Sequence, residues 1–450
     1  MARRASGWCG VEFHYYGAGK FADNPCSSSA VAASNQTWQG VTCSQSPQVC
    51  SSQTCHITQI DLTSYGLSGS IPADIRHLSL LELLRLDENQ LTGPIPHEVG
   101  QLVALQQLSF RSNQLTGIIP VEVGQLTALD LLYLYSNQLT GTIPVEMGQL
   151  TALERFALYI NQLTGSIPVE VGQLTALEVL YLYSNQLTGT IPVEVGQLTA
   201  LWLLVLYNNQ LTGTIPVEVG QLTALELVYL NNNLLTGTIP VDVGQLTVLE
   251  QLYLYDNWLT GTLPVEVGQL TALKQLSLRN NHLTGTIPVE VGQLTTIQQL
   301  SLRNNELTGV IPVEVGQLTA LELLYLSDNR LTGTIPNTVG YLESLDELWL
   351  QDNNLVGALP SGMSDMRKLR SLFLQNNLLT GHLDEAFNAN QLLLSNVDLS
   401  NNRLSGSLSA ELFLLPQLQV LALSGACAYL TFPGEVIVFV LVIVSVIVMY

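Results

Sequence analysis

The sequence predicts an α/β solenoid, a superhelix of 24-residue turns with a parallel strand sheet on its concave face. Three observations predict this fold. One pattern recurs at a constant spacing through most of the chain, leucines alternate with other residues within each copy, and only 11% of the residues are charged. A globular domain of average composition has about 25% charged residues. The repeat and the low charge together indicate a chain that builds one long core by stacking similar units.

The repeated pattern justifies each element of the turn in order. It reads L-x-x-L-x-L-x-x-N-x-L-T-G-x-I-P-x-x-V-G-Q-L-T-A, and copies begin at positions 57, 81, 105 and so on to 369, with a further copy at 394 and a partial one at 418. The L-x-L step, as in Leu132-Tyr133-Leu134, directs two leucines inward and the middle residue outward, which is the period of a half-buried strand. No turn can bury its own leucines, so the turns must stack and their strands form a parallel sheet.

Asparagine at the ninth position, from Asn89 to Asn377, follows each strand where the chain bends. Its amide can satisfy backbone groups that a buried turn leaves unpaired, so we interpret this column as structural. Glycine at the thirteenth position permits a sharp bend. Proline at the sixteenth position has no backbone N–H, so it donates no backbone hydrogen bond. Both belong to the scaffold.

The pattern resembles the plant-type leucine-rich repeat signature L-x-x-L-x-L-x-x-N-x-L-[ST]-G-x-[IL]-P over residues 57–426. The stretch from Trp38 to Cys43 is similar to that family's N-terminal cap, W-x-G-V-x-C. The resemblance implies a leucine-rich repeat superhelix at 57–426 behind a cysteine-containing cap at 1–56. The family includes receptor ectodomains, receptor-like proteins without kinases, enzyme inhibitors and ice-binding members, so the resemblance predicts the fold more narrowly than the ligand.

Cysteines cluster where a solenoid needs a cap. Stacked turns leave an apolar end exposed, and five of the six cysteines lie between Cys9 and Cys55, ahead of the first turn. Disulfide candidates in this segment indicate an oxidising compartment, with the pairing open. Zinc is the alternative, but the C-x6-C-x4-C spacing contains no C-x-x-C step. The disulfide candidates are Cys26, Cys43, Cys50 and Cys55, and the glycosylation candidate is Asn35.

The C-terminal segment, 427–450, ends in the apolar run V-I-V-F-V-L-V-I-V-S-V-I-V-M-Y. This run would span only about 22 Å as a helix, against a hydrocarbon core of roughly 30 Å. We predict a membrane anchor, either a truncated transmembrane segment or a cleaved lipid-anchor signal. A buried last strand is the alternative, because valine and isoleucine favour strands. No signal peptide is visible after Met1, yet both anchor hypotheses place the solenoid at the cell surface, outside the cell.

Nothing in the sequence predicts catalysis, a cofactor or a metal. The six histidines are scattered, and no G-x-S-x-G, H-E-x-x-H or phosphate-binding loop occurs. A net charge of −21 argues against nucleic acid or an anionic membrane surface as the main partner. We therefore expect a non-enzymatic protein whose function lies on the outward-facing columns of residues.

Aromatic residues fill two outward columns of the predicted strand face, the fifth and seventh positions of the turn. Their spacing from turn to turn is about 4.8 Å. An outward strand position has no packing reason to be aromatic, and tyrosine suits recognition surfaces, so we predict a ligand-binding face. The alternative is that cross-strand aromatic pairs only stabilise the sheet. The predicted aromatic binding residues are Tyr133, Tyr135, Tyr159, Tyr181, Tyr183, Tyr207, Tyr229, Tyr253, Tyr255, Tyr325 and Trp349.

Arginines interrupt the seventh column beside these tyrosines. Arg279 and Arg303 lie in successive turns, so we predict that they share one carboxylate or phosphate of an extended ligand. The ligand would then dock with a defined direction along the turns.

Two further columns bear on function. Acidic residues occupy the eighteenth position from Asp74 to Glu314, and we interpret them as a solvated edge that keeps an apolar rod soluble, with a calcium ladder as the alternative. Thr-Gly-Thr, as at 140–142, recurs in a regular array that resembles those of ice-binding solenoids.

We conclude from the sequence that this is an extracellular, receptor-like recognition protein that binds a peptide, protein or glycan on its concave face. The runner-up is a structural or ice-binding repeat protein that uses the Thr-Gly-Thr ladder.

Overall fold

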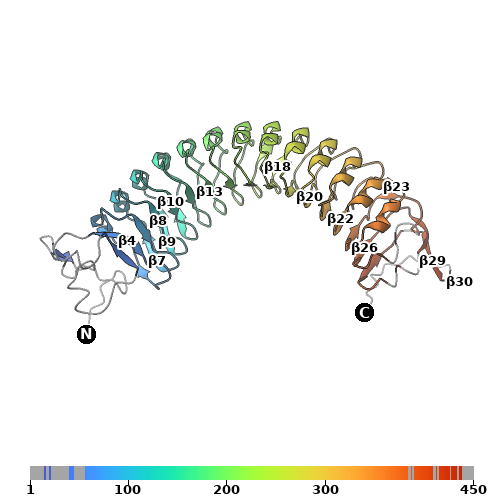
Figure 1. Ribbon diagram of the computed structural model, residues 1–450, viewed down its shortest axis with the longest axis horizontal. Helices are drawn as coiled ribbons and strands as arrows, with labels where there is room; N and C mark the ends of the chain where they lie inside the picture. The colour runs from blue at the N-terminus through green and yellow to red at the C-terminus, as the bar shows by residue number, and fades with distance from the viewer. Residues whose placement is uncertain are drawn as a thin grey trace. The chain divides into compact units, whose positions relative to one another are not determined.

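The computed structural model describes residues 15–16, 20–21, 40–44, 56–383, 387, 390–408, 412, 415–425, 427–432 and 435–437. The chain divides into two compact units, Met1–Thr212 and Gly213–Tyr450. Both units repeat the same turn, in which a short strand, an extended segment and a 3-10 helix follow one another (Figure 1).

In the first unit, the strand of each turn pairs in parallel with the equivalent strand of the next turn, as in Leu132 opposite Phe156. The sheet starts with one antiparallel strand, because β3 runs against β4. The strands are β3 Val41–Cys43, β4 Ile57–Asp61, β6 Leu83–Arg85, β8 Gln107–Ser109, β10 Leu131–Tyr133, β12 Arg155–Ala157, β13 Val179–Tyr181 and β14 Leu203–Val205. Beside the sheet lie the separate pair β1 Tyr15–Tyr16 and β2 Lys20–Phe21, and the short strands β5 Ser68–Gly69, β7 Gln90–Pro94, β9 Gln114–Ile118 and β11 Gln138–Thr140.

The second unit repeats this arrangement in the same register, as in Leu348 opposite Leu372. Its main strands are β15 Leu227–Tyr229, β17 Gln251–Tyr253, β19 Gln275–Ser277, β20 Gln299–Ser301, β21 Leu323–Tyr325, β22 Glu347–Trp349, β24 Ser371–Phe373, β26 Asn396–Asp398 and β28 Val420–Ala422. Shorter strands accompany them: β16 Thr236–Gly237, β18 Trp258–Leu259, β23 Val356–Gly357, β25 Leu378–Leu379, β27 Ser405–Leu408, β29 Cys427–Phe432 and β30 Glu435–Ile437.

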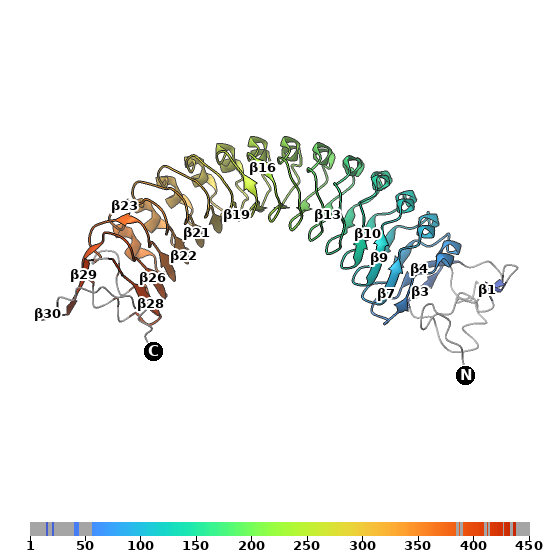
Figure 2. The same cartoon turned by 180° about the vertical axis from the view of Figure 1, so that it is seen from behind.

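The predicted solenoid class is confirmed, and its helical part is made of 3-10 turns. In each unit these turns lie on the outer side and the main strands on the inner side, as seen from behind in Figure 2. The described residues form no α-helix. In the first unit the 3-10 turns are η1 Ala73–His77, η2 His97–Gln101, η3 Val121–Gln125, η4 Val145–Gln149, η5 Val169–Gln173 and η6 Val193–Gln197. In the second they are η7 Val217–Gln221, η8 Val241–Gln245, η9 Val265–Gln269, η10 Val289–Gln293, η11 Val313–Gln317, η12 Asn337–Tyr341 and η13 Ser361–Asp365.

The glycine at the twentieth position explains why the 3-10 turns stack so closely. A Cβ added to Gly148 would lie 2.5 Å from the carbonyl oxygen of Glu170 in the next turn. Only glycine permits this approach of one backbone to the next. The proline that precedes each 3-10 turn, such as Pro144, has φ of −64° and lacks an N–H, so it starts the turn without leaving a donor unpaired.

The leucines form the core as predicted, since Leu132, Leu134 and Leu139 have no exposed surface. Nearly all of the ninth-position asparagines are also buried, and they act as predicted. Asn185 accepts a hydrogen bond from the backbone N–H of Leu163 at 3.1 Å and donates to the carbonyl of Leu158, also at 3.1 Å. Each asparagine thus ties its own turn to the turn before it.

Both predicted end segments lie partly outside the described residues. Cys43 is disulfide-bonded, whereas Asn35, Cys26, Cys50 and Cys55 lie outside the part of the chain that the structure describes. The predicted anchor begins as strands: β29 pairs in parallel with β27 and antiparallel with β30. Residues 438–450 lie outside the described residues, and within the described ranges no helix is long and apolar enough to cross a membrane.

Candidate functional site

The strand face of the first unit carries a stack of tyrosines at the seventh position, which we call the tyrosine ladder: Tyr135, Tyr159, Tyr183 and Tyr207. Neighbouring ring centroids lie 4.0 Å, 4.4 Å and 4.4 Å apart, and the ring planes differ by no more than 14°. The parallel register sets this spacing, because equivalent side chains of adjacent strands lie about 4.8 Å apart. The four residues are half-buried, and each stacked ring covers part of its neighbour.

The hydroxyl groups of the tyrosine ladder lie in a partly dry environment. Burial, followed by hydrogen bonding with Tyr135, raises the pKa of Tyr159. Burial and the neighbouring Tyr207 raise the pKa of Tyr183 to about 12. Tyr159 and Tyr183 are therefore neutral at physiological pH and present stacking area with hydroxyl groups, without charge.

The fifth-position tyrosines extend this surface sideways. Tyr181 contacts Tyr159 edge to face at 5.7 Å and lies 6.1 Å from Tyr183, and Tyr133 lies 5.6 Å from Tyr135. Burial raises the pKa of Tyr181 as well. The structure thus brings together all six of the predicted tyrosines in this unit, and it shows that they also stabilise one another.

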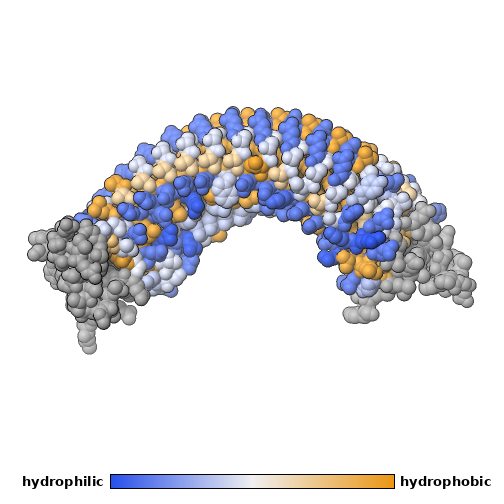
Figure 3. All heavy atoms as spheres, viewed as in Figure 1, coloured by the Kyte–Doolittle hydropathy of each residue, from blue (hydrophilic) through white to orange (hydrophobic). Residues whose placement is uncertain are grey.

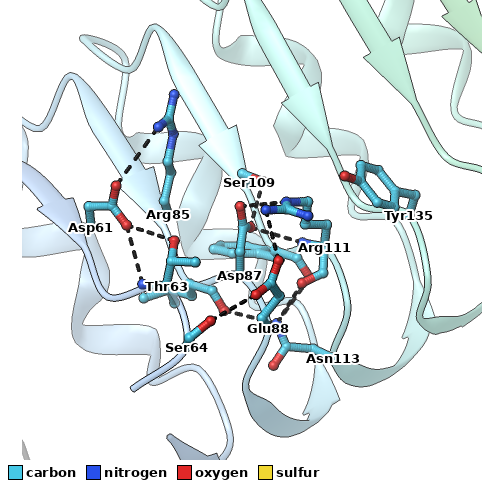
Figure 4. Close-up of polar contacts among 12 residues, drawn as sticks. Asp61, Thr63, Ser64, Arg85, Asp87, Glu88, Ser109, Arg111, Asn113 and Tyr135 are labelled. Carbon is cyan, nitrogen blue, oxygen red and sulfur yellow. Dashed lines mark hydrogen bonds and ion pairs between the residues drawn. The ribbon is translucent and has the colours of Figure 1, made fainter. Parts of the chain in front are cut away.

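A polar cluster adjoins the N-terminal end of the tyrosine ladder (Figure 4). Asp87 is 4% exposed and accepts hydrogen bonds from Ser109 Oγ at 2.6 Å and from Arg111 Nε at 2.9 Å. Arg111 also pairs with Glu88 at 3.0 Å, and its guanidinium lies 5.8 Å from the ring centroid of Tyr135. Although burial acts to lower it, the pKa of Arg111 is raised by the hydrogen bond and charge of Asp87. Arg111 is therefore held in place and is a fixed end for the ladder.

The strand face of the second unit begins with another aromatic group. Tyr229 and Tyr253 stack at 4.8 Å, and Tyr253 lies 5.9 Å from Tyr255. The hydroxyls of Tyr229 and Tyr253 donate to the side-chain oxygens of Gln251 and Gln275. Burial raises the pKa of Tyr253 to about 12.

Further along the same unit, three aromatic side chains meet at Trp349. Its ring centroid lies 4.6 Å from that of Tyr325 and 5.5 Å from that of Phe373, which contacts it edge to face. Tyr325 donates a hydrogen bond to Glu347 Oε2 at 2.7 Å, and burial together with this bond raises the pKa of the Tyr325 hydroxyl. Trp349 is therefore the centre of a second aromatic surface.

The two predicted arginines do not converge on one position. Arg279 pairs with Asp256 at 3.3 Å and lies over the ring of Tyr255 at 4.2 Å. Arg303 lies over the ring of Trp349 at 5.7 Å and forms no ion pair with any residue that the structure describes. Arg303 is thus the more available cation of the two, because the charge of Arg279 is already balanced.

Sequence reasoning missed several polar residues around Trp349. Ser327, Gln351 and Gln375 occupy the seventh column, and each has a buried side-chain oxygen without a hydrogen-bond partner among the described residues. The signal was present: this column holds aromatic or basic residues in most earlier turns and changes to small and amide residues here.

The remaining columns support the scaffold. The Thr140 hydroxyl donates to the Gly117 carbonyl at 3.2 Å, and the methyl of Thr142 would meet a Cβ added to Gly165 at 2.7 Å. Threonines of the Thr-Gly-Thr array therefore make contacts between turns. Exposed valines such as Val145 and Val169 begin the 3-10 turns, and Figure 3 shows hydrophobic and hydrophilic residues alternating along this outer side within each unit. No cluster of acidic, histidine or cysteine side chains within the described ranges could hold a metal ion.

Comparison with known protein families finds one match that covers most of the chain. A model described as a leucine-rich repeat region matches residues 42–189 and 263–437. A second model, described as a leucine rich repeat, matches residues 248–270. Together these matches include the strand-face residues of β4 to β13 and β19 to β28.

Comparison with solved structures finds plant receptors among the similar proteins. The PEPR1–AtPEP1 complex is 31% identical, with a TM-score of 0.77 over 88% of this chain and 58% of the other. The Arabidopsis receptor kinase HAESA, solved with the peptide hormone IDA and the co-receptor SERK1, is 33% identical, with a TM-score of 0.75 over 87% of this chain and 64% of the other. This chain therefore spans less than two thirds of either receptor chain.

A bacterial protein is also similar. A leucine-rich repeat protein of Leptospira interrogans is 35% identical, with a TM-score of 0.62, and the match covers 80% of this chain and 94% of that one. The fold alone therefore does not define the ligand, and the side chains of the strand face must supply that argument.

Proposed function

Because this chain belongs to the leucine-rich repeat family and its turns are of the plant type, we propose that it is a receptor-like recognition protein that binds an extended peptide. It acts outside the cell, is itself attached to the membrane, and has no catalytic activity. The proposal places the ligand along the strand faces, across successive turns.

The observation that carries the proposal is the tyrosine ladder. Four half-buried rings present a continuous row of apolar edges and neutral hydroxyls, already ordered before any ligand arrives. Preordered aromatic side chains lose little rotamer entropy on binding, and they suit an extended chain because their spacing follows that of the strands.

The similar receptors supply the ligand class. HAESA was solved with the peptide hormone IDA, and PEPR1 was solved in complex with AtPEP1; both resemble this chain over most of its length. On the second unit Arg303 would receive a carboxylate of the ligand, and the aromatic residues of each unit's strand face would supply contact area. A protein or glycan ligand is the broader form of the same hypothesis.

Selection of peptides from a random displayed library on the immobilised full chain tests the proposal. Replacing Tyr135, Tyr159 and Tyr183 by serine should weaken a selected peptide by about tenfold or more, since aromatic anchors dominate binding energy at interfaces. The matched control replaces Val145, Val169 and Val193 by serine, because these residues are also exposed but begin the 3-10 turns of the same unit. Equal binding by all three proteins would contradict the proposal.

The same proteins also test the structural or ice-binding alternative. Replacing Thr142, Thr190 and Thr214 by bulky residues should leave peptide binding unchanged under our proposal. Loss of ice-recrystallisation inhibition in this variant, with no peptide selected by the parent chain, would favour the threonine array instead.

A further inference from the structure

Buried polar atoms without a hydrogen-bond partner are confined to one region of the described residues. All six belong to the second unit and to four successive turns of it. Most buried polar groups in folded proteins are paired, so a local concentration of unpaired ones indicates a site that awaits a partner. The atoms are Ser301 Oγ, Ser327 Oγ, Asp346 Oδ1, Trp349 Nε1, Gln351 Oε1 and Gln375 Oε1.

One of these atoms belongs to a serine in the turn that Arg303 and Trp349 span. Ser327 has no exposed surface and lies in the seventh column between Arg303 and Gln351. Arg303 and Trp349 contact each other across this turn, since the guanidinium lies 5.7 Å from the ring centroid. The serine therefore lies where a cation and an indole already meet.

The chemistry of the unpaired atoms favours a hydrogen-bond donor as ligand. The side-chain oxygens of Asp346, Gln351 and Gln375 can only accept hydrogen bonds, whereas Trp349 Nε1 is the one atom of the six that can only donate. Gln351 and Gln375 follow adjacent strands in the same register, which places them about 4.8 Å apart. One ligand group with several N–H donors can reach both.

The charge around these acceptors favours a cation. Asp346 pairs through Oδ2 with Arg370 at 3.2 Å. Glu347 and Asp352, on the same turn, form no ion pair with a basic side chain in the described part of the chain. The three acidic residues of this turn outnumber the two nearby basic ones, Arg370 and Arg303, so a positively charged donor is favoured on the side of the glutamines away from Arg303.

The aromatic rings of this face already bind guanidinium groups. Arg279 lies over Tyr255 at 4.2 Å, and Arg303 lies over Trp349. Cations are attracted to the faces of aromatic rings, most strongly to tryptophan. Phe373, beside Trp349 on the far side from Tyr325, offers a further ring close to both glutamines.

We propose that Trp349, Gln351, Phe373 and Gln375 form a subsite for a basic side chain, arginine or lysine, of the ligand. The subsite rests on the proposed peptide-binding function and adds the class of residue that the ligand carries at this place. It adjoins Arg303, whose guanidinium lies over the Trp349 ring. The basic group of the ligand would therefore lie toward Phe373 and Gln375, and Arg303 would receive an acidic group.

The test compares two short fluorescent peptides on the full chain. One alternates serine with arginine, and the other replaces each arginine by citrulline, which has the same shape and no charge. We expect the arginine peptide to bind about tenfold more tightly. Gln351→Leu and Gln375→Leu should each remove most of this difference, and Gln351→Glu should increase it.

Gln299→Leu is the matched control, because Gln299 lies half-buried on the same strand face and has no unpaired buried atom. Equal affinity for the arginine and citrulline peptides, no binding of either, or equal losses in Gln299→Leu and Gln351→Leu would each overturn the subsite. These outcomes leave the proposed function intact if a library-selected peptide still depends on the tyrosine ladder. Loss of that dependence would contradict the proposed function instead.

Discussion

Replacing Asn185 by alanine should destabilise the first unit by about 3 kcal/mol, because the side chain joins two turns through buried hydrogen bonds. Its Oδ1 accepts from Leu163 N–H, and its Nδ2 donates to the carbonyls of Leu158 and Leu182, each at 3.1 Å. Alanine leaves the buried Leu163 N–H without a partner, which alone costs about 1–3 kcal/mol. The loss of the donor that the two carbonyls share adds about 1 kcal/mol to this cost.

Amide hydrogen exchange measures this loss where it occurs. Exchange of the Leu163 amide should be about two orders of magnitude faster in Asn185→Ala, since local opening sets the exchange rate. Asn208→Ser is the control: Asn208 is exposed, and Ser184 adopts the same left-handed backbone conformation one turn earlier. A change smaller than about fivefold at Leu163 would refute the hydrogen-bond argument, because it would mean a cost under about 1 kcal/mol.

Asn185→Asp separates the two halves of the same interaction. A carboxylate can accept from Leu163 N–H but cannot donate to the carbonyls, so the protonated acid is the better fit. Its pKa in the folded state should therefore rise above the usual value of about 3.9. The stabilisation is then complete below the unfolded-state pKa and is lost as pH rises through the folded-state pKa. Urea unfolding midpoints that are lower at pH 4 than at pH 7 would contradict this reasoning.

Three further predictions concern other columns of the turn. Ile160 holds a φ of +53° and is 48% exposed, so Ile160→Asn should raise the free energy of unfolding by about 1 kcal/mol, as urea denaturation can show. Gly148→Ala should lower it by about 1–3 kcal/mol, because the added Cβ meets the Glu170 carbonyl, and a melting temperature equal to the parent's would refute the close approach. Absorbance at alkaline pH should show Tyr183 ionising near pH 12 rather than 10, with stability lost between these values because the folded state favours the neutral hydroxyl.

The scaffold could be predicted from the sequence because its residues are repeated for backbone reasons. A leucine column, an asparagine column and a glycine column each follow from stacking one turn on the next, and a single turn shows them all. The outward direction of Tyr133 and Tyr135 followed from strand alternation in the same way. These positions depend only on the register, which the constant period of the repeat defines.

The contacts between outward side chains could not be predicted from the period. Arg279 and Arg303 occupy equivalent positions, yet one pairs with Asp256 and the other lies over Trp349, two turns further on. The contacts of each arginine depend on which residues of the neighbouring turns lie within reach, and on side-chain rotamers that the sequence pattern does not encode. The same holds for the glutamines near Trp349, whose unpaired oxygens become visible only when their surroundings are known.

The turns that depart from the repeated pattern are therefore a better guide to function than the turns that follow it. The column of stacked tyrosines in the first unit would stabilise the sheet whether or not a ligand existed, because each ring buries the next. The change from aromatic and basic residues to Ser327, Gln351 and Gln375 has no such benefit, since it leaves buried polar atoms unpaired and lowers stability. A cost that the scaffold does not require is the physical reason to look for a basic residue of the ligand at Trp349, in addition to the contacts that the tyrosine ladder supplies.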